Sequence, residues 1–305
     1  FVAGHVAIDQ IIDSRYSAPR ESLGGALCYS TICLKSLGYK SEIITKIGKD
    51  FPKEYARFLL SNAEIDVERW RAQDCKTTRY TIDRARENER QLWLVSKCRN
   101  LQMKDFIRAI DMFSGRSRLL IVNSIAGEIT FSLLERIVEE FDHVYLDSQG
   151  FVRKFNKHTG KVTMKPGLDI SSLSGIDVLK TDSEELFALT GVRDKETSIR
   201  KLSKVATILL VTAGSGNVEL YEDGRIRLEA KPLQTTVKDT TGAGDIMLSS
   251  FIARNLETDD LEDALLFSVS AASLSVRNVG IEKAILSRSE VLEEAKKVRI
   301  VQQRD

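Results

Sequence analysis

The sequence has 305 residues, of which 42% are hydrophobic and 29% are charged, and its 45 Lys and Arg nearly balance its 44 Asp and Glu. A formal net charge of +1 without any basic block excludes the electrostatic surface that nucleic-acid binding requires. No run is apolar enough to cross a membrane, and no basic-then-apolar leader begins the chain. We therefore expect a cytoplasmic protein with neither nucleic acid nor a membrane as its partner.

The first strongly patterned segment covers residues 77–97. Polar and apolar residues alternate on both sides of the turn-prone residues 87–89, which predicts an antiparallel hairpin. Two interpretations of this hairpin stay open: an edge extension of a larger sheet, or a lid over a site.

From residue 119 onward, short apolar runs alternate with segments of helical period. The runs are rich in β-branched residues, as is typical of buried parallel strands, and they lie at residues 119–122, 144–146, 176–179 and 207–211. The helical segments lie near residues 129–140, 183–190 and 196–204, and a further helix with a small-residue face covers residues 261–276. This alternation predicts an α/β fold, doubly wound, in which a parallel sheet carries helices on both faces and binds ligands at the carboxyl ends of its strands.

The Cys and His residues give no sign of a metal site. Cys28, Cys33, Cys75 and Cys98 form no Cys-x-x-Cys pair, so we expect reduced thiols, although Cys75 and Cys98 flank the hairpin and can come near each other. The three histidines lack metal-ligand spacing, and only His5 lies near a candidate substrate strand.

The chemically most informative segment is Asp239-Thr240-Thr241-Gly242-Ala243-Gly244-Asp245, which precedes an apolar helical run at residues 246–256. Two glycines at the start of a helix expose backbone N–H groups where the helix dipole favours negative charge, so Gly242, Ala243 and Gly244 predict an anion cradle. A carboxylate and a bound phosphate repel each other, so a carboxylate at this position is expected only if it has a chemical role. We therefore interpret Asp245 as the catalytic base that accepts a proton from an attacking hydroxyl. The alternative is a simple helix cap.

The segment from Asp239 to Asp245 resembles the C-terminal signature of the ribokinase or PfkB carbohydrate kinase family. Residues 4–9 resemble that family's first strand with its substrate-binding Asp9, and Gly24-Gly25-Ala26 with residues 46–50 is similar to its N-terminal signature. Residues 182–185 resemble an Asn-x-x-Glu motif with Asp182 in place of Asn, and residues 212–216 resemble a strand-end loop that meets ATP.

The resemblance implies a ribokinase-like single domain over residues 1–305, with a small β lid formed mainly by residues 75–98 and part of 10–20. It also implies transfer of the γ-phosphoryl group of ATP to a hydroxyl. ATP-binding residues follow from it at Asp182, Thr212, Gly214, Gly216 and Asn278. By the same resemblance, Glu185 holds Mg²⁺ through water. The region of Asp239 holds a monovalent cation in some relatives, and the sequence leaves that point open for this chain. The change to Asp182 leaves nucleotide affinity and metal preference open.

Within this family, the sequence looks most like the inositol kinase branch. Residues 24–29, 77–80 and 147–153 carry that likeness, the last as Asp-x-Gln-Gly-x-x-Arg. The acceptor-binding residues it implies are Asp9, Gly24, Gly25, Tyr29, Gln149 and Arg153, with myo-inositol as the best guess. Arg153 could instead meet phosphate or stay solvated on its loop.

Three alternatives remain at this point. One is another sugar kinase, and one is a nucleoside kinase with a stacking pocket near Tyr29, Tyr80 or Trp93. The third is a sugar- or nucleotide-binding protein without turnover. Monomer and homodimer are both compatible with the sequence.

Overall fold

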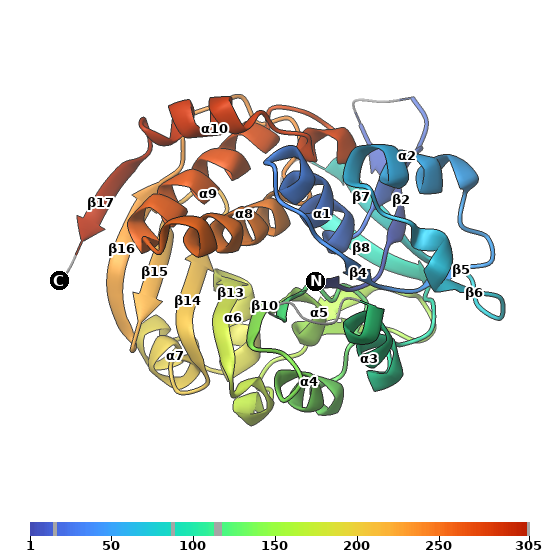
Figure 1. The fold of residues 1–305 in the computed structure, drawn as a ribbon, viewed down its shortest axis with the longest axis horizontal. Coiled ribbons are helices and arrows are strands. Elements are labelled where there is room, and N and C mark those ends of the chain that lie inside the picture. The colour runs from blue at the N-terminus through green and yellow to red at the C-terminus, as the bar shows by residue number, and fades with distance from the viewer. Residues whose placement is uncertain (15–16, 87–88, 113–117, 304–305) are drawn as a thin grey trace.

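The computed structural model describes residues 1–14, 17–86, 89–112 and 118–303. Its centre is a nine-stranded sheet in the order β17-β16-β15-β14-β13-β10-β9-β1-β4 (Figure 1). The strands from β14 to β4 are parallel, and β15, β16 and β17 are antiparallel, which confirms the mostly parallel sheet. The strands are β1 Val2–Ala3, β4 Ile43–Ile44, β9 Leu119–Val122, β10 His143–Asp147, β13 Ile176–Asp182, β14 Ala206–Thr212, β15 Val218–Glu222, β16 Arg225–Lys231 and β17 Arg299–Gln303.

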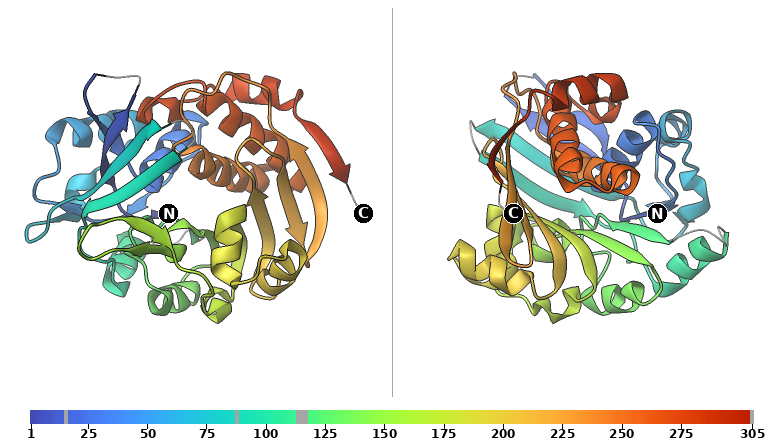
Figure 2. Two further views of the ribbon diagram at one scale, coloured as in Figure 1. Left: turned by 180° about the vertical axis from the view of Figure 1, so that it is seen from behind. Right: turned by 60° about the vertical axis from the view of Figure 1, so that its left-hand side comes forward.

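Helices cover both faces of this sheet, as predicted (Figures 1 and 2). One face carries α1 Ala26–Ser36, α8 Ala243–Thr258, α9 Leu261–Ser275 and α10 Arg288–Ala295. The other carries α3 Met103–Met112, α4 Phe131–Val138, α6 Ser183–Thr190 and α7 Lys195–Leu202. Large side chains such as Phe106, Phe251 and Phe267 are fully buried between the layers. In the part of the chain that the structure describes, no helix has the length and apolarity to span a bilayer.

A second, separate sheet lies beside the first (Figure 2), and we call it the lid because it contains the hairpin for which a lid role is predicted. Its four strands run in the order β3-β2-β7-β8 and are β3 Arg20–Gly24, β2 Ala7–Asp13, β7 Thr78–Arg86 and β8 Glu89–Ser96. The pairing of β7 with β8 confirms the hairpin, whose turn residues 87 and 88 lie outside the described residues. Because this sheet is separate, the alternative of an edge extension of the main sheet is wrong.

The N-terminal strand differs from the expectation. Asp9 belongs to the lid strand β2 and not to the first strand of the central sheet, because β1 ends at Ala3. At Gly4 the chain passes so close to the Asn123 carbonyl that a Cβ would lie 2.2 Å from its oxygen. Only a glycine fits at this position, where the backbone passes from β1 of the main sheet to β2 of the lid.

Several shorter elements complete the fold. They are α2 Lys53–Ala63, α5 Gln149–Val152, the 3₁₀ turns η1 Val67–Trp70, η2 Ile170–Leu173 and η3 Ile281–Ala284, and the strand pairs β5 Ile47–Gly48 with β6 Arg71–Ala72 and β11 Arg153–Phe155 with β12 Val162–Met164.

The structure corrects the expectation of four reduced thiols. Cys75 and Cys98 form a disulfide, with their Cα atoms 5.4 Å apart, and it links the segment before β7 to the end of β8. Cys28 and Cys33 are unpaired and buried, and burial raises the pKa of Cys33 to about 12. A thiol held in that state is a poor nucleophile.

A buried carboxylate joins the lid to the main sheet. Glu128 accepts hydrogen bonds from the amides of His5 at 2.8 Å and Ala126 at 2.7 Å, and from Ser124 Oγ at 3.0 Å. His5 is itself buried, with its ring bonded to Thr78 Oγ1 and to the Arg99 carbonyl, and burial lowers its pKa. His5 thus has a structural role at the base of the lid.

Glu128→Gln tests that junction. The substituted amide would turn its own NH₂ group towards the donors around it, so we expect a loss of about 1–3 kcal/mol in the free energy of unfolding. Urea denaturation of Glu128→Gln and of the control Glu139→Gln, at an exposed residue, measures it. Equal stabilities for the two variants would contradict this account.

Candidate active site

The amino end of α8 forms the predicted anion cradle. Gly242 has a φ of 76°, and a Cβ there would lie 2.3 Å from the Tyr29 ring, so a side chain is excluded on two grounds. A Cβ on Gly244 would lie 2.7 Å from Lys180 Nζ. Within the described chain, the amides of Gly242 and Gly244 have no hydrogen-bond acceptor. The two glycines therefore leave both amides without side-chain cover, with Lys180 close to Gly244, an arrangement compatible with the predicted anion cradle.

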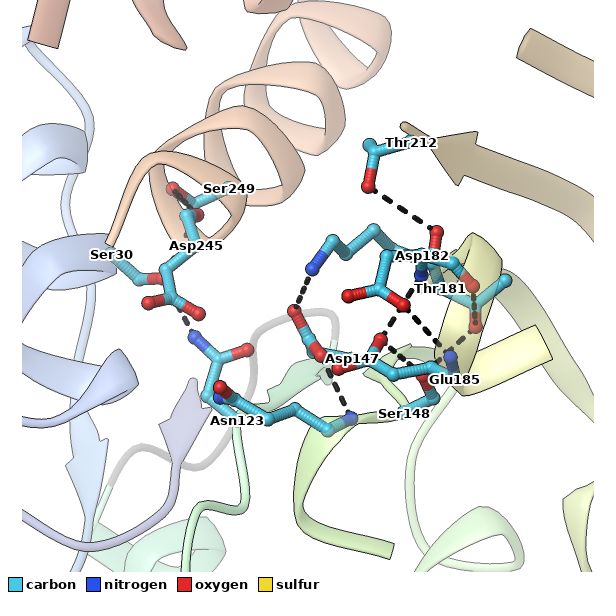
Figure 3. Close-up of polar contacts among 12 residues, drawn as sticks. Ser30, Asn123, Asp147, Ser148, Thr181, Asp182, Glu185, Thr212, Asp245 and Ser249 are labelled. Carbon is cyan, nitrogen blue, oxygen red and sulfur yellow. Dashed lines mark hydrogen bonds and ion pairs between the residues drawn. The ribbon is translucent and has the colours of Figure 1, made fainter. Parts of the chain in front are cut away.

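Asp245 is buried in the first turn of α8. Its main-chain carbonyl accepts hydrogen bonds from Ser249 Oγ at 2.8 Å and from Ser30 Oγ of α1 at 3.2 Å, so two helices hold this turn in place. Figure 3 shows Asp245 on one side of the site, with Asp147, Asp182 and Glu185 on the other. The acidic side chains of the site thus come from different elements, Asp245 from α8 and the others from the ends of β10 and β13 and from α6.

A small cavity of 60 Å³ adjoins Asp245 and Gly242. It brings together most of the predicted acceptor residues, and its lining is Ala7, Asp9, Gly25, Ala26, Tyr29, Tyr80, Ile82, Leu92, Ile125, Gln149, Arg153, Thr241, Gly242 and Asp245. Gly24 does not line it, but a Cβ there would lie 2.0 Å from Asp9 Oδ2. Gly24 thus makes room for the Asp9 carboxylate.

Arg153 is part of this cavity wall, so the alternative of a solvated loop residue is wrong. Its Nη1 donates to the Ile125 carbonyl at 3.0 Å, and its Nη2 donates to Gln149 Oε1. The guanidinium also lies 6.0 Å from the centre of the Tyr80 ring, whose hydroxyl donates to the same Ile125 carbonyl at 2.7 Å. These contacts hold the guanidinium of Arg153, which is a hydrogen-bond donor, and the amide of Gln149, which can also accept, at one wall of the cavity.

A buried ion pair that sequence reasoning missed lies beside the cradle. Lys180 Nζ is 2.8 Å from Asp147 Oδ2, and both side chains are buried. A charged residue directly after the apolar run at residues 176–179 was the signal available in the sequence. Because Lys180 also approaches Gly244, it brings positive charge to the anion cradle.

Asp182 and Glu185 form a capping box at the start of α6. Asp182 Oδ1 accepts from the amides of Glu184 and Glu185, and Glu185 Oε2 accepts from the Asp182 amide at 3.1 Å and from Ser148 Oγ at 2.9 Å. Burial raises the pKa of Glu185 to about 7, against the opposing effect of Lys180. The change from Asn to Asp at residue 182 is therefore compatible with an ordered helix start.

Asp239 lies between two cations that the sequence did not reveal. Lys283 Nζ donates to the Asp239 main-chain carbonyl at 2.8 Å and is 3.4 Å from its Oδ2. Arg84 of the lid strand β7 donates to Oδ1 at 2.8 Å and also to Thr241 Oγ1. Burial alone would raise the pKa of Asp239, but Lys283, the Thr241 amide and Arg84 lower it to about 2.

The remaining residues expected at ATP lie at the ends of β14 and α9. Thr212 ends β14 and donates through Oγ1 to the Thr181 carbonyl at 3.5 Å. Gly214 follows with a φ of 59°, and a Cβ there would have no described atom within 4 Å, whereas Gly216 turns back on Ala213. Asn278 follows α9 and is exposed. These positions form an accessible loop region rather than an enclosed pocket.

Comparisons with known proteins identify the family to which this chain belongs. The model of the pfkB family of carbohydrate kinases matches residues 1–287. The chain is 25% identical over 291 residues to an inositol 3-kinase of Arabidopsis thaliana, covering 92% of this chain and 75% of the relative. It is also similar to the structure of a fructokinase with bound ATP from Xylella fastidiosa, with a TM-score of 0.75, 20% identity, and coverage of 97% and 98%.

A further similar structure is that of a pyrophosphate-dependent kinase in the ribokinase family complexed with a pyrophosphate analog and myo-inositol. The TM-score is 0.76 at 23% identity, with 92% and 98% of the two chains covered. Fold and family thus define a sugar or polyol kinase that phosphorylates a hydroxyl group. The chain belongs to the pfkB family of carbohydrate kinases, and its fold is that of ribokinase.

Gly242→Ala tests the cradle. The added methyl group would strain the backbone and collide with the Tyr29 ring, so we expect kcat/KM to fall by about 100-fold or more, in line with the loss of a phosphate-binding donor. Gly224→Ala is the matched control, because its φ of 75° carries the same strain while its nearest atom, in Ser203, is 3.6 Å away. The control should lose about 1 kcal/mol of stability and keep its kcat/KM. Equal loss of activity in both would contradict the assignment.

The low pKa of Asp239 predicts a pH-dependent contribution to stability. A carboxyl whose pKa is lowered in the folded state stabilises the fold at pH values above its unfolded-state pKa, which is about 4. This contribution disappears as the pH falls towards 2. The stability difference between wild type and Asp239→Asn should therefore shrink by about 2 kcal/mol over this interval. Urea unfolding at a series of pH values measures it, with exposed Asp223→Asn as the control. A difference that stayed constant down to pH of about 2 would overturn the prediction.

Proposed function

We propose that this kinase transfers the γ-phosphoryl group of ATP to a hydroxyl of a cyclic polyol, with myo-inositol as the acceptor. The observation that supports this most is the cavity in which Asp9, Gln149 and Arg153 lie beside Asp245 and Gly242. myo-Inositol carries a hydroxyl on every ring carbon, and each hydroxyl can both donate and accept a hydrogen bond. Asp9, Gln149 and Arg153 together can therefore pair with several of these hydroxyls at once. The likeness to an inositol 3-kinase points in the same direction.

Asp245 acts as the general base in this proposal. It lines the acceptor cavity and lies in the first turn of the helix that forms the cradle. Its carboxylate accepts the proton of the attacking hydroxyl as the oxygen bonds to phosphorus. The lid residues of the cavity exclude water, so that the acceptor hydroxyl, and not a water molecule, attacks.

The cradle and Lys180 stabilise the charge of the transferring group. The amides of Gly242 and Gly244 meet its oxygens, and Lys180 Nζ lies within reach of the same place beside Gly244. Fixed donors of this kind need no reorganisation during the transfer, which is why they lower the barrier.

Mg²⁺, which the family implies, fits the carboxylates on the donor side of the site. Among the described residues no three acidic, His or Cys side chains converge to bind a metal directly. Both hydrogen bonds that Glu185 accepts end on Oε2, which leaves Oε1 for a metal-bound water. A hydrated ion that is held mainly by substrate phosphates matches this donor set. When bound, Mg²⁺ neutralises charge on the phosphate oxygens.

The nucleoside alternative is less well supported by the cavity. It needs aromatic faces for base stacking, yet Trp93 lies outside the cavity, in a separate depression with Phe155 and His158. Tyr29 and Tyr80 are in the cavity, but the Tyr29 ring is already approached by Gly242 and Lys283, and the Tyr80 ring by Arg153. The further alternative of a binding protein without turnover does not agree with the family, whose members are kinases.

The test is a phosphorylation assay with Mg²⁺ over myo-inositol, common sugars and nucleosides, with ATP and pyrophosphate as separate donors. We expect turnover of myo-inositol with ATP, and a fall of about 10²- to 10⁴-fold in kcat for Asp245→Asn, as is usual for loss of a general base. Asp223→Asn, an exposed residue away from the site, makes the same chemical change as a control.

Other outcomes separate the parts of the proposal. Turnover of a nucleoside would retain the mechanism and reject the polyol, and turnover with pyrophosphate alone would reject ATP. Full activity of Asp245→Asn would reject the general base.

A further inference from the structure

The ammonium of Lys283 is buried directly behind the anion cradle. Its side chain is 0% exposed, and that of Asp239 is 1% exposed. Lys283 lies on η3, just after Gly280, whose amide is 3.4 Å from Asp239 Oδ2. A burial of this depth is costly for a lysine unless its charge is matched, and here Asp239 supplies the matching charge.

A monovalent cation, which the family resemblance left open, does not fit beside Asp239. The main-chain oxygen and Oδ2 of Asp239 face Lys283 Nζ at 2.8 Å and 3.4 Å. Its Oδ1 already accepts from Arg84 at 2.8 Å and from the Thr241 amide at 3.0 Å. All three oxygens are therefore engaged, and two positive groups repel a third.

The Tyr29 ring lies between the ammonium of Lys283 and the glycine turn of the cradle. Lys283 Nζ lies 5.7 Å from the centre of the Tyr29 ring, within the range of a cation–π contact. On the cradle side, Gly242 lies so close to the Tyr29 ring that it has no room for a Cβ. Lys283 thus holds the start of the loop through Asp239 and supports its glycine turn through Tyr29.

We propose that the ammonium of Lys283 replaces a monovalent cation behind the anion cradle, so that this kinase works without potassium or sodium and Lys283 is a positioning residue for the cradle. This inference rests on the kinase activity proposed above. It further implies that a small neutral side chain at residue 283 creates a site for a free cation, because the oxygens of Asp239 would then lack their partner.

The test compares wild type with Lys283→Ala and Lys283→Met in potassium, ammonium or tetramethylammonium chloride at one ionic strength. The wild-type kcat should differ by less than about twofold between the salts, whereas Lys283→Ala should lose at least about tenfold in tetramethylammonium. Potassium or ammonium should restore most of that loss. Lys283→Met should stay impaired in every salt, since its side chain fills the space without supplying charge.

A second readout needs no substrate and therefore separates this inference from the assignment of the acceptor. The melting temperature of Lys283→Ala should be higher in potassium than in tetramethylammonium, while that of wild type should be the same in both. Adding Asp239→Asn to Lys283→Ala should abolish the difference, because the carboxylate that binds the ion is gone.

Several results would overturn the proposal. One is a wild-type enzyme that requires potassium, and another is a Lys283→Ala variant whose activity and melting temperature do not respond to the cation. If Lys283→Ala is obtained as folded protein only when potassium is present, the proposal is supported. If it fails to fold in both salts, the proposal is contradicted.

Discussion

Charge balance at the carboxyl edge of the central sheet is the constraint on which the site depends. Asp147, Glu185, Asp239 and Asp245 are all buried in this region, and a phosphate-bearing donor adds further negative charge. Unmatched, these groups would repel both one another and the donor. Lys180 and Lys283 each bond one buried carboxylate, and the cradle amides add partial positive charge. The anion site therefore exists only because the fold buries cations together with its acids.

The lid contributes charge as well as shape to this balance. Asp9 lies on β2 and faces the acceptor cavity, whereas Arg84 lies on the neighbouring strand β7 and bonds Asp239 at the start of the cradle. The two strands are paired, so a displacement of the lid moves both side chains together. In the proposed mechanism, contact with the acceptor and order in the loop at Asp239 are thus coupled through one small sheet, and Glu128 ties the base of that sheet to the core.

Local pattern was enough to predict the parallel strands and the helix after residue 245, because each depends on neighbours in the chain. The candidate acceptor residues, which are distant from one another in sequence, came instead from the family resemblance. Local pattern failed where partners are distant in sequence. Asp9 lies in the lid because its strand pairs with β7, which is far away along the chain, and Cys75 meets Cys98 across the hairpin. Arg84 and Lys283 gave no periodic signal, since the sequence does not show which distant group a long side chain on a strand or a 3₁₀ turn will contact.

Tyr29 shows why such partners must be considered together. The bulky Tyr29 ring is compatible with the cradle only because Gly242 leaves space for it, and the ring also contacts Lys283. A lysine differs from a free ion in that its three N–H donors point in set directions and its position is determined when the chain folds. The free-energy cost of removing water from the lysine ammonium is therefore incurred when the chain folds and not when the donor binds. The loop that it holds is already in place when the donor binds, which is the condition under which fixed dipoles accelerate a transfer.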